Sequence, residues 1–179
     1  MTGGYQIKEQ SAPYFLTFQV VNWVDVFTRK RYRDIIIESL NYCIQHKKLN
    51  VHAWVIMSNH MHVIFSHENN LSGIIRDFKT HTSKEIIQSI IEFPESRREW
   101  MLFQFNIRGK MNSRNSNYQF WTQENHPIQL DTTEKIEQRL NYIHENPVRS
   151  GIVEESIHFI YSSAPDYADK KGLVPINKI

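Results

Sequence analysis

The residues best suited to chemistry are two histidines that follow an apolar run, His60-Met61-His62 within AWVIMSNHMHVIF. In a β-strand, successive side chains point to opposite faces, so His60 and His62 would share one face and Met61 the other. That face would present two imidazoles, which are common metal ligands. With 9 histidines in 179 residues, such a pair also arises by chance, and two half-exposed strand histidines are the structural alternative.

A second group of polar residues lies near the C-terminus, in a predicted helix that contains LNYIHENP. Tyr142 and Asn146 are four residues apart and therefore share one side of that helix. The apolar stripe consists of Ile136, Leu140 and Ile143, and Tyr142 projects about 120° from its centre. A tyrosine required for packing should lie on the stripe, so its position indicates a functional phenol. The structural alternative is a tyrosine at the rim that half-covers the sheet.

Two imidazoles and one amide oxygen form a mixed nitrogen and oxygen ligand set. A closed zinc site favours four ligands, usually with cysteine, whereas an open Mg²⁺ or Mn²⁺ site leaves positions for water and phosphate. Removing a tyrosine proton at pH 7 costs on the order of 4 kcal/mol, and a divalent cation can supply several kcal/mol by polarising a phosphodiester. We therefore expect phosphoryl transfer, with His60, His62 and Asn146 as metal ligands and Tyr142 as the nucleophile.

The composition is that of a globular chain, with 40% hydrophobic and 22% charged residues and a formal net charge of +2. This mildly basic balance is compatible with a polyanionic partner. The single cysteine, Cys43, excludes a disulfide framework within the chain and suits a reducing compartment. The N-terminus lacks a signal-peptide pattern, and no apolar run approaches the roughly 20 residues of a membrane span. We expect a cytoplasmic, nucleoid-associated protein with no membrane partner.

The hydrophobic pattern predicts an α+β fold in the order β-α-β-β-α-β followed by a third helix. The strands are expected at 14–21, 51–57, 60–65 and 118–122, and the helices at 29–47, 71–91 and 133–146. The last helix would be capped by Asp131 and stopped by Pro147. This order predicts a ferredoxin-like antiparallel sheet with strand order 4-1-3-2, helices on one face and a C-terminal catalytic helix. We expect a single domain over 1–179, with its core at about 14–167 and an irregular insertion at about 94–119, in which 95–105 could form a short helix.

Together these motifs resemble a known family. The His60-Met61-His62 motif after WVIMSN resembles the histidine–hydrophobe–histidine motif of the HUH endonucleases. Tyr142 and Asn146 within NYIHENPVRSGIV resemble the single-tyrosine transposases of the IS200/IS605 type, and most of all their REP-associated branch. The resemblance implies a metal site formed by His60, His62 and Asn146, and Tyr142 as the nucleophile. It also implies cleavage of single-stranded DNA near a hairpin, a covalent 5′-phosphotyrosine with a free 3′-hydroxyl, and strand transfer.

Single-stranded or hairpin DNA is therefore the expected partner, bound by a monomer or a homodimer. Clustered basic residues and neighbouring aromatic residues are the candidate DNA contacts, because cations bind the phosphate backbone and aromatic rings stack on unpaired bases. They are Arg29, Lys30, Arg31, Arg33, Arg97, Arg98, Arg108, Lys110, Arg114, Tyr118 and Trp121. The structural alternative for each basic cluster is an ordinary solvated face.

Two other functions remain open from the sequence. A domesticated protein that binds hairpin DNA or RNA without turnover could use the same sheet as a stacking platform. Such a protein would bind with strong salt dependence and cut nothing. A metal-dependent hydrolase of small phosphoesters would form no covalent intermediate, and it would leave the basic clusters unexplained.

Overall fold

Four strands form one antiparallel sheet in the order β2-β3-β1-β4. The computed structural model describes residues 6–111 and 117–179. The strands are β1 (Tyr14–Gln19), β2 (Asn50–Ile56), β3 (His60–Ser66) and β4 (Ile128–Gln129). This is the predicted order 4-1-3-2 with β3 inside the sheet, so the predicted fold class is confirmed.

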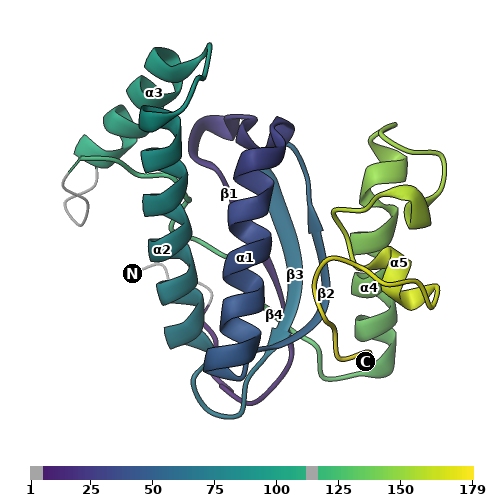
Figure 1. The fold of residues 1–179 in the computed structure, drawn as a ribbon. Helices are drawn as coiled ribbons and strands as arrows, with labels where there is room; N and C mark the ends of the chain where they lie inside the picture. The colour runs from purple at the N-terminus through teal and green to yellow at the C-terminus, as the bar shows by residue number, and fades with distance from the viewer. Residues whose placement is uncertain (1–5, 112–116) are drawn as a thin grey trace.

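Helices cover both faces of this sheet (Figure 1). The long helices α1 (Lys30–Lys47) and α2 (Leu71–Glu92) pack against each other and lie over one face. The helix α4 (Thr133–Arg149) packs against β2 and β3 from the other side, next to α5 (Ala164–Tyr167). The remaining helix, α3 (Arg98–Lys110), follows α2, and three short 3₁₀ turns are η1 (Val21–Trp23), η2 (Val26–Thr28) and η3 (Ser156–His158). Within the described ranges, no helix is long and apolar enough to cross a membrane.

The β2–β3 hairpin has the predicted tight turn. The amide of Met57 donates to the carbonyl of His60 at 2.8 Å, so Ser58 and Asn59 form a two-residue loop. In β3, Met61, Val63 and Phe65 face α1 and α2, where Phe65 contacts Phe18 of β1. Because side chains alternate along a strand, the two histidines of β3 face α4.

The structure differs from the sequence-based prediction at three elements. The fourth strand is β4 at 128–129, and of the predicted strand at 118–122 only Trp121 forms a bridge, with Val20. The short helix allowed at 95–105 within the irregular insertion is present, but it runs over 98–110 as α3, because Met101, Phe105 and Gly109 recur every four residues and are buried.

Helix α4 continues through Pro147 to Arg149 instead of stopping before the proline. Pro147 is buried, and its position in the last turn forfeits only one intrahelical hydrogen bond. The N-cap is Thr132 and not Asp131, since the Thr132 hydroxyl accepts from the amide of Lys135 at 3.3 Å.

The C-terminal segment lies along the outer edge of β2. Ile56 donates to the carbonyl of Tyr161 and Ser163 donates to that of Trp54, each at 2.9 Å. Further along, Asn177 donates to the carbonyl of Val51 at 2.8 Å. These bonds occupy backbone groups that an edge strand would otherwise offer to another chain. A dimer that extended the sheet through β2 would therefore have to displace this segment.

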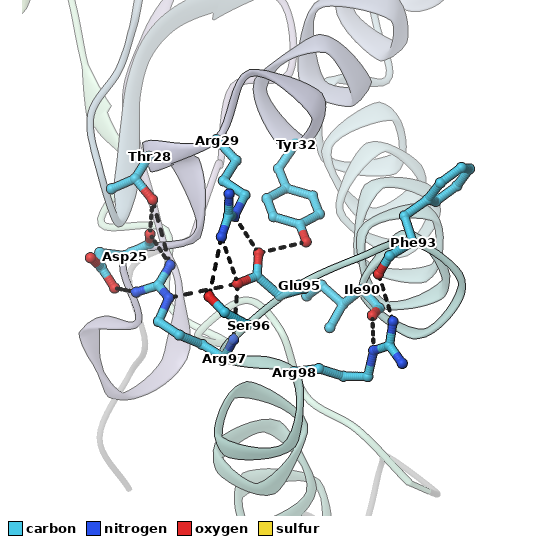
Figure 2. Close-up of polar contacts among 10 residues, drawn as sticks. All are labelled: Asp25, Thr28, Arg29, Tyr32, Ile90, Phe93, Glu95, Ser96, Arg97 and Arg98. Atoms are coloured by element: carbon cyan, nitrogen blue, oxygen red, sulfur yellow. Dashed lines mark hydrogen bonds and ion pairs between the residues drawn. The ribbon is translucent and has the colours of Figure 1, made fainter.

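Helix α3 is attached to the start of α1 by a buried carboxylate (Figure 2). The Glu95 side chain is fully buried and accepts from Arg29 Nε at 2.6 Å and from the Tyr32 hydroxyl at 3.1 Å. The backbone amide of Arg97 also donates to it, at 3.1 Å. Burial raises the pKa of the Glu95 carboxyl, but these hydrogen bonds outweigh it and hold the pKa below its ordinary value.

We predict that Glu95→Ala lowers the free energy of unfolding at pH 7 by about 2–3 kcal/mol. The Tyr32 hydroxyl and the Arg97 amide lose their acceptor, and an unsatisfied buried group costs about 1–3 kcal/mol. Urea unfolding measures the loss, and Glu99→Ala, an exposed change in the first turn of α3, should lose no more than about 1 kcal/mol. Since the folded pKa is depressed, the contribution is complete above about pH 4.3 and is lost as the pH falls through the folded value. Equal losses in both variants would contradict this role for Glu95.

Candidate active site

The two histidines are positioned by the pairing of β3 with β1. His60 lies opposite Gln19, and His62 lies opposite Thr17. Their rings are 4.8 Å apart between centroids at 68°. His62 is 6% exposed and His60 is half-buried, so the pair lies at the border between the sheet interior and the surface.

In each imidazole, Nδ1 already has a polar partner. His62 Nδ1 lies 2.9 Å from the Thr17 hydroxyl, and His60 Nδ1 lies 2.7 Å from Asn59 Oδ1. The Asn59 amide nitrogen donates to the carbonyl of Trp23 at 3.4 Å, which orients Oδ1 towards His60. A carbonyl oxygen only accepts, so His60 carries its proton on Nδ1 and leaves Nε2 with a lone pair. Thr17 can accept from His62 in the same way.

Helix α4 places Tyr142 against His62. The two ring centroids are 5.1 Å apart at 70°, and Tyr142 also meets the edge of Phe15 at 5.9 Å. Phe15 in turn stacks on His62 at 5.3 Å and 22°. Buried Ile143 and Pro147, on the adjoining apolar stripe, anchor α4, so Tyr142 is held beside the histidine pair within one chain.

Asn146 lies one turn after Tyr142 on the same side of α4, as predicted from their spacing. It is half-buried, and among the described residues its side-chain amide has no hydrogen-bond partner. Its oxygen therefore remains able to accept a bond or to bind a metal.

Two arginines of α4 make the site electropositive. The Arg149 guanidinium lies 4.6 Å above the Tyr142 ring and donates to the Tyr142 carbonyl at 2.9 Å. The Arg139 guanidinium lies 5.0 Å from the centre of the Phe15 ring. Burial, together with His60 and these two cations, lowers the pKa of His62 to about 3. Burial also lowers the pKa of His60, so both imidazoles are neutral at pH 7.

Sequence reasoning missed Thr17, Asn59, Phe15, Arg139 and Arg149. Both arginines had a usable signal, because they lie three residues before and seven after Tyr142 and so share its side of the helix. Thr17 is 45 residues from His62, and only the strand register brings them together.

Three of the predicted DNA-contacting arginines bind other parts of the chain instead (Figure 2). Arg29 pairs with the buried Glu95, and Arg97 pairs with Asp25 at 2.5 Å. Arg98 donates to backbone carbonyls at the end of α2, at 2.9 and 2.6 Å. Each holds α3 and its neighbours in place, and none contacts the histidine pair in this structure.

The other basic residues predicted to contact DNA differ in how many contacts they make within the chain. Lys30 pairs with the aspartate one turn later in α1, at 2.8 Å, and Arg108 donates to an asparagine of η1, also at 2.8 Å. Arg31 and Arg33 cover aromatic rings at 4.4 and 3.9 Å, whereas Lys110 is exposed at the end of α3. Arg114 lies outside the described residues.

The prediction that Trp121 stacks on an unpaired base does not fit the structure. Its side chain is 5% exposed, and its Nε1 donates to the hydroxyl of Thr82 at 3.0 Å. A buried ring has no face free for a base. Tyr118 is half-buried and packs against the hydrophobic core, so it offers only part of its ring.

One face of the antiparallel sheet carries the imidazole pair, and α4 packs on that face and places a phenol beside the pair. This is the arrangement expected of a tyrosine transposase. Residues 10–108 match the family described as "Transposase IS200 like", and the chain belongs to this family. The matched range includes both histidines and ends before α4. The predicted family is thereby confirmed, whereas the roles of individual residues remain predictions.

A solved structure supports the same fold. It is described as "Structure of the REP associates tyrosine transposase bound to a REP hairpin", and it is 16% identical in sequence with a TM-score of 0.68. The alignment covers 100% of this chain and 92% of that chain. No curated protein matches this sequence. At this level of identity, the likeness establishes the architecture.

We predict that His62 does not titrate between pH 8 and pH 5 in the folded protein, since its pKa is about 3. An NMR titration of the ring Cε1–H signal, assigned with His62→Gln, measures this. The urea-unfolded chain is the control and should titrate near pH 6.5. Because the unfolded chain binds this proton first, the stability contributed by neutral His62 declines as the pH falls below about 6.5. A midpoint between pH 6 and 7 in the folded protein would contradict the buried environment.

Proposed function

We propose that the protein cleaves and rejoins single-stranded DNA near hairpins through a covalent 5′-phosphotyrosine on Tyr142. One observation carries this proposal: the Tyr142 ring lies 5.1 Å from the His62 ring, within one chain and on the sheet face opposite α1 and α2. Hydrophobic packing alone would not require a phenol, two oriented imidazoles and two guanidiniums at one place. Strand cleavage by a tyrosine uses all three kinds of group.

The proposed ligands of a divalent cation, Mg²⁺ or Mn²⁺, are His60, His62 and Asn146. The donor set fits such an ion because both Nδ1 atoms have partners and each Nε2 is left for coordination. Within residues 6–111 and 117–179, no three His, Cys, Asp or Glu side chains form a group that could hold a metal. An amide oxygen from α4 would supply the third ligand. When bound, the cation would polarise the scissile phosphodiester as a Lewis acid.

The chain's own residues would orient the nucleophile and receive the phosphate. Contacts with Phe15 and His62 hold the Tyr142 ring from the sheet side, and Arg149 covers it from α4. In the proposed step, Tyr142 Oη bonds to phosphorus, and the bond from phosphorus to the 3′ oxygen breaks. The phenolic proton passes to solvent, and the departing 3′ oxygen takes up a proton to become a free hydroxyl. Arg139 and Arg149 would offset the negative charge of the phosphate.

Hairpin DNA is the proposed substrate for two reasons. The structural neighbour is bound to a REP hairpin. In addition, the site lies among basic residues of α4, which suits the phosphate backbone of nucleic acid. The proposal includes strand transfer, since attack of a 3′-hydroxyl on the phosphotyrosine is the reverse of the cleavage step.

We predict that Tyr142→Phe abolishes the covalent adduct and leaves hairpin affinity within about twofold, because only the nucleophilic oxygen is removed. A hairpin oligonucleotide labelled at its 3′ end is incubated with protein and Mg²⁺ or Mn²⁺, and denaturing gel electrophoresis detects the adduct. Tyr42→Phe, an exposed change on α1, is the matched control and should react like the native protein.

Three outcomes would contradict the proposal in different ways. An adduct that persists in Tyr142→Phe would mean that another residue is the nucleophile. Tight, salt-dependent hairpin binding without any adduct in either metal would identify a non-catalytic nucleic-acid-binding protein. Release of cleaved DNA without an adduct would indicate hydrolysis.

We predict that Thr17→Val weakens Mn²⁺ binding about 10- to 100-fold, because His62 Nδ1 loses the partner that fixes its tautomer and orientation. Electron paramagnetic resonance of free Mn²⁺ measures this directly, without reference to activity. Thr80→Val removes an exposed hydroxyl on α2 and should leave the binding unchanged. Equal Mn²⁺ affinity in the two variants would show that Thr17 does not support a metal ligand.

A further inference from the structure

An exposed tryptophan lies in the turn that follows β1. Trp23 is 64% exposed, whereas Trp54 and Trp121 are buried. It has a φ of 56°, and the preceding Asn22 has a φ of 54°, so two successive residues other than glycine adopt the left-handed conformation. Such residues are uncommon and strained, and they persist only where the surrounding structure fixes them.

Helix α3 fixes this turn. The Asn22 side chain donates to Gln104 Oε1 at 2.9 Å and accepts from Arg108 Nε at 2.8 Å. The amide of Trp23 donates to the carbonyl of Val20 at 3.2 Å. Hydrogen bonds from two residues of another helix thus hold a turn that presents a large aromatic side chain to solvent. Packing of the Trp23 side chain does not explain this strained turn, since the indole is mostly exposed.

The same turn is joined to the histidine pair through one residue. Asn59 donates from its amide nitrogen to the carbonyl of Trp23 at 3.4 Å, and its Oδ1 lies 2.7 Å from His60 Nδ1. The Asn59 carbonyl also accepts from the amide of Val20 at 2.9 Å. The backbone of Trp23 is therefore one side chain away from a proposed metal ligand. Arg108, a cation on α3, adjoins the same turn.

The geometry points to Trp23 as a platform on which one unpaired base next to the scissile phosphate stacks. This inference rests on the proposed function and extends it by assigning a residue that positions the single-stranded part of the substrate. Every base has a flat aromatic face, so stacking on an indole tolerates many sequences. Arg108, which donates to the neighbouring Asn22, brings a cation to the same turn, and for this reason a strand of nucleic acid with its phosphates fits the position better than an apolar protein segment does.

The test compares DNA binding by Trp23→Ala, Trp23→Phe and Trp100→Ala. Trp100 is 47% exposed on α3 and serves as the matched control. Fluorescence anisotropy without divalent cations measures affinity for a blunt hairpin and for the same hairpin with a single-stranded extension. Thermal unfolding verifies that each variant is folded. We expect Trp23→Ala to bind the extended hairpin about tenfold more weakly and the blunt hairpin unchanged, with Trp23→Phe close to the native protein.

An abasic substitution identifies the stacked base. At one position of the extension, removing the base should weaken binding as much as Trp23→Ala does, and the two losses should not add. Equal effects of Trp23→Ala and Trp100→Ala, additive losses at every position, or no preference of the native protein for the extended hairpin would overturn the inference. The adduct assay separates this result from the proposed function. An adduct with no Trp23 effect refutes only the platform, and a Trp23 effect with no adduct refutes only the catalysis.

Discussion

The pairing of β1 with β3 is the constraint on which the site depends. It sets Thr17 opposite His62 and directs both histidines to the face that α4 covers. A shift of the register by one residue would turn the imidazoles towards α1 and α2 and bring Met61 to the site. The apolar residues on the other face of β3 resist such a shift, because it would remove them from the core that they form with α1 and α2. The hydrophobic core thus fixes the polar site as well as the fold.

The electrostatic environment of the site disfavours a protonated His62 and favours a bound anion. His62 is buried between Phe15 and Tyr142, and the cations of Arg139 and Arg149 lie close by. Burial and the two guanidiniums both disfavour protonation of His62, so its imidazole stays neutral and keeps a lone pair. A phosphate or a phosphodiester meets the opposite environment, since fixed guanidiniums favour an anion. The arrangement thus suits an anion such as a phosphodiester and disfavours His62 as a general acid at pH 7.

The sequence predicted features that depend on local periodicity. Alternation around His60 and His62 and the four-residue spacing of Tyr142 and Asn146 gave the correct faces of β3 and α4. Tertiary contacts decided the rest: Arg29 neutralises a carboxylate 66 residues away, and Trp121 is buried where a strand and a stacking ring were expected. Such long-range contacts leave no periodic pattern in the local sequence. Residue type alone therefore suggested Arg29 and Trp121 as DNA contacts.

The family and the fold are established. The central proposal is that His60, His62 and Asn146 bind one divalent cation. Anomalous diffraction from a crystal soaked in Mn²⁺ tests it most directly, because the scattering locates the ion without reference to activity. We expect one strong peak within about 2.0–2.4 Å of His60 Nε2, His62 Nε2 and the Asn146 side-chain oxygen, beside the Tyr142 hydroxyl. A peak bound elsewhere, or none at these histidines at saturating Mn²⁺, would contradict the account.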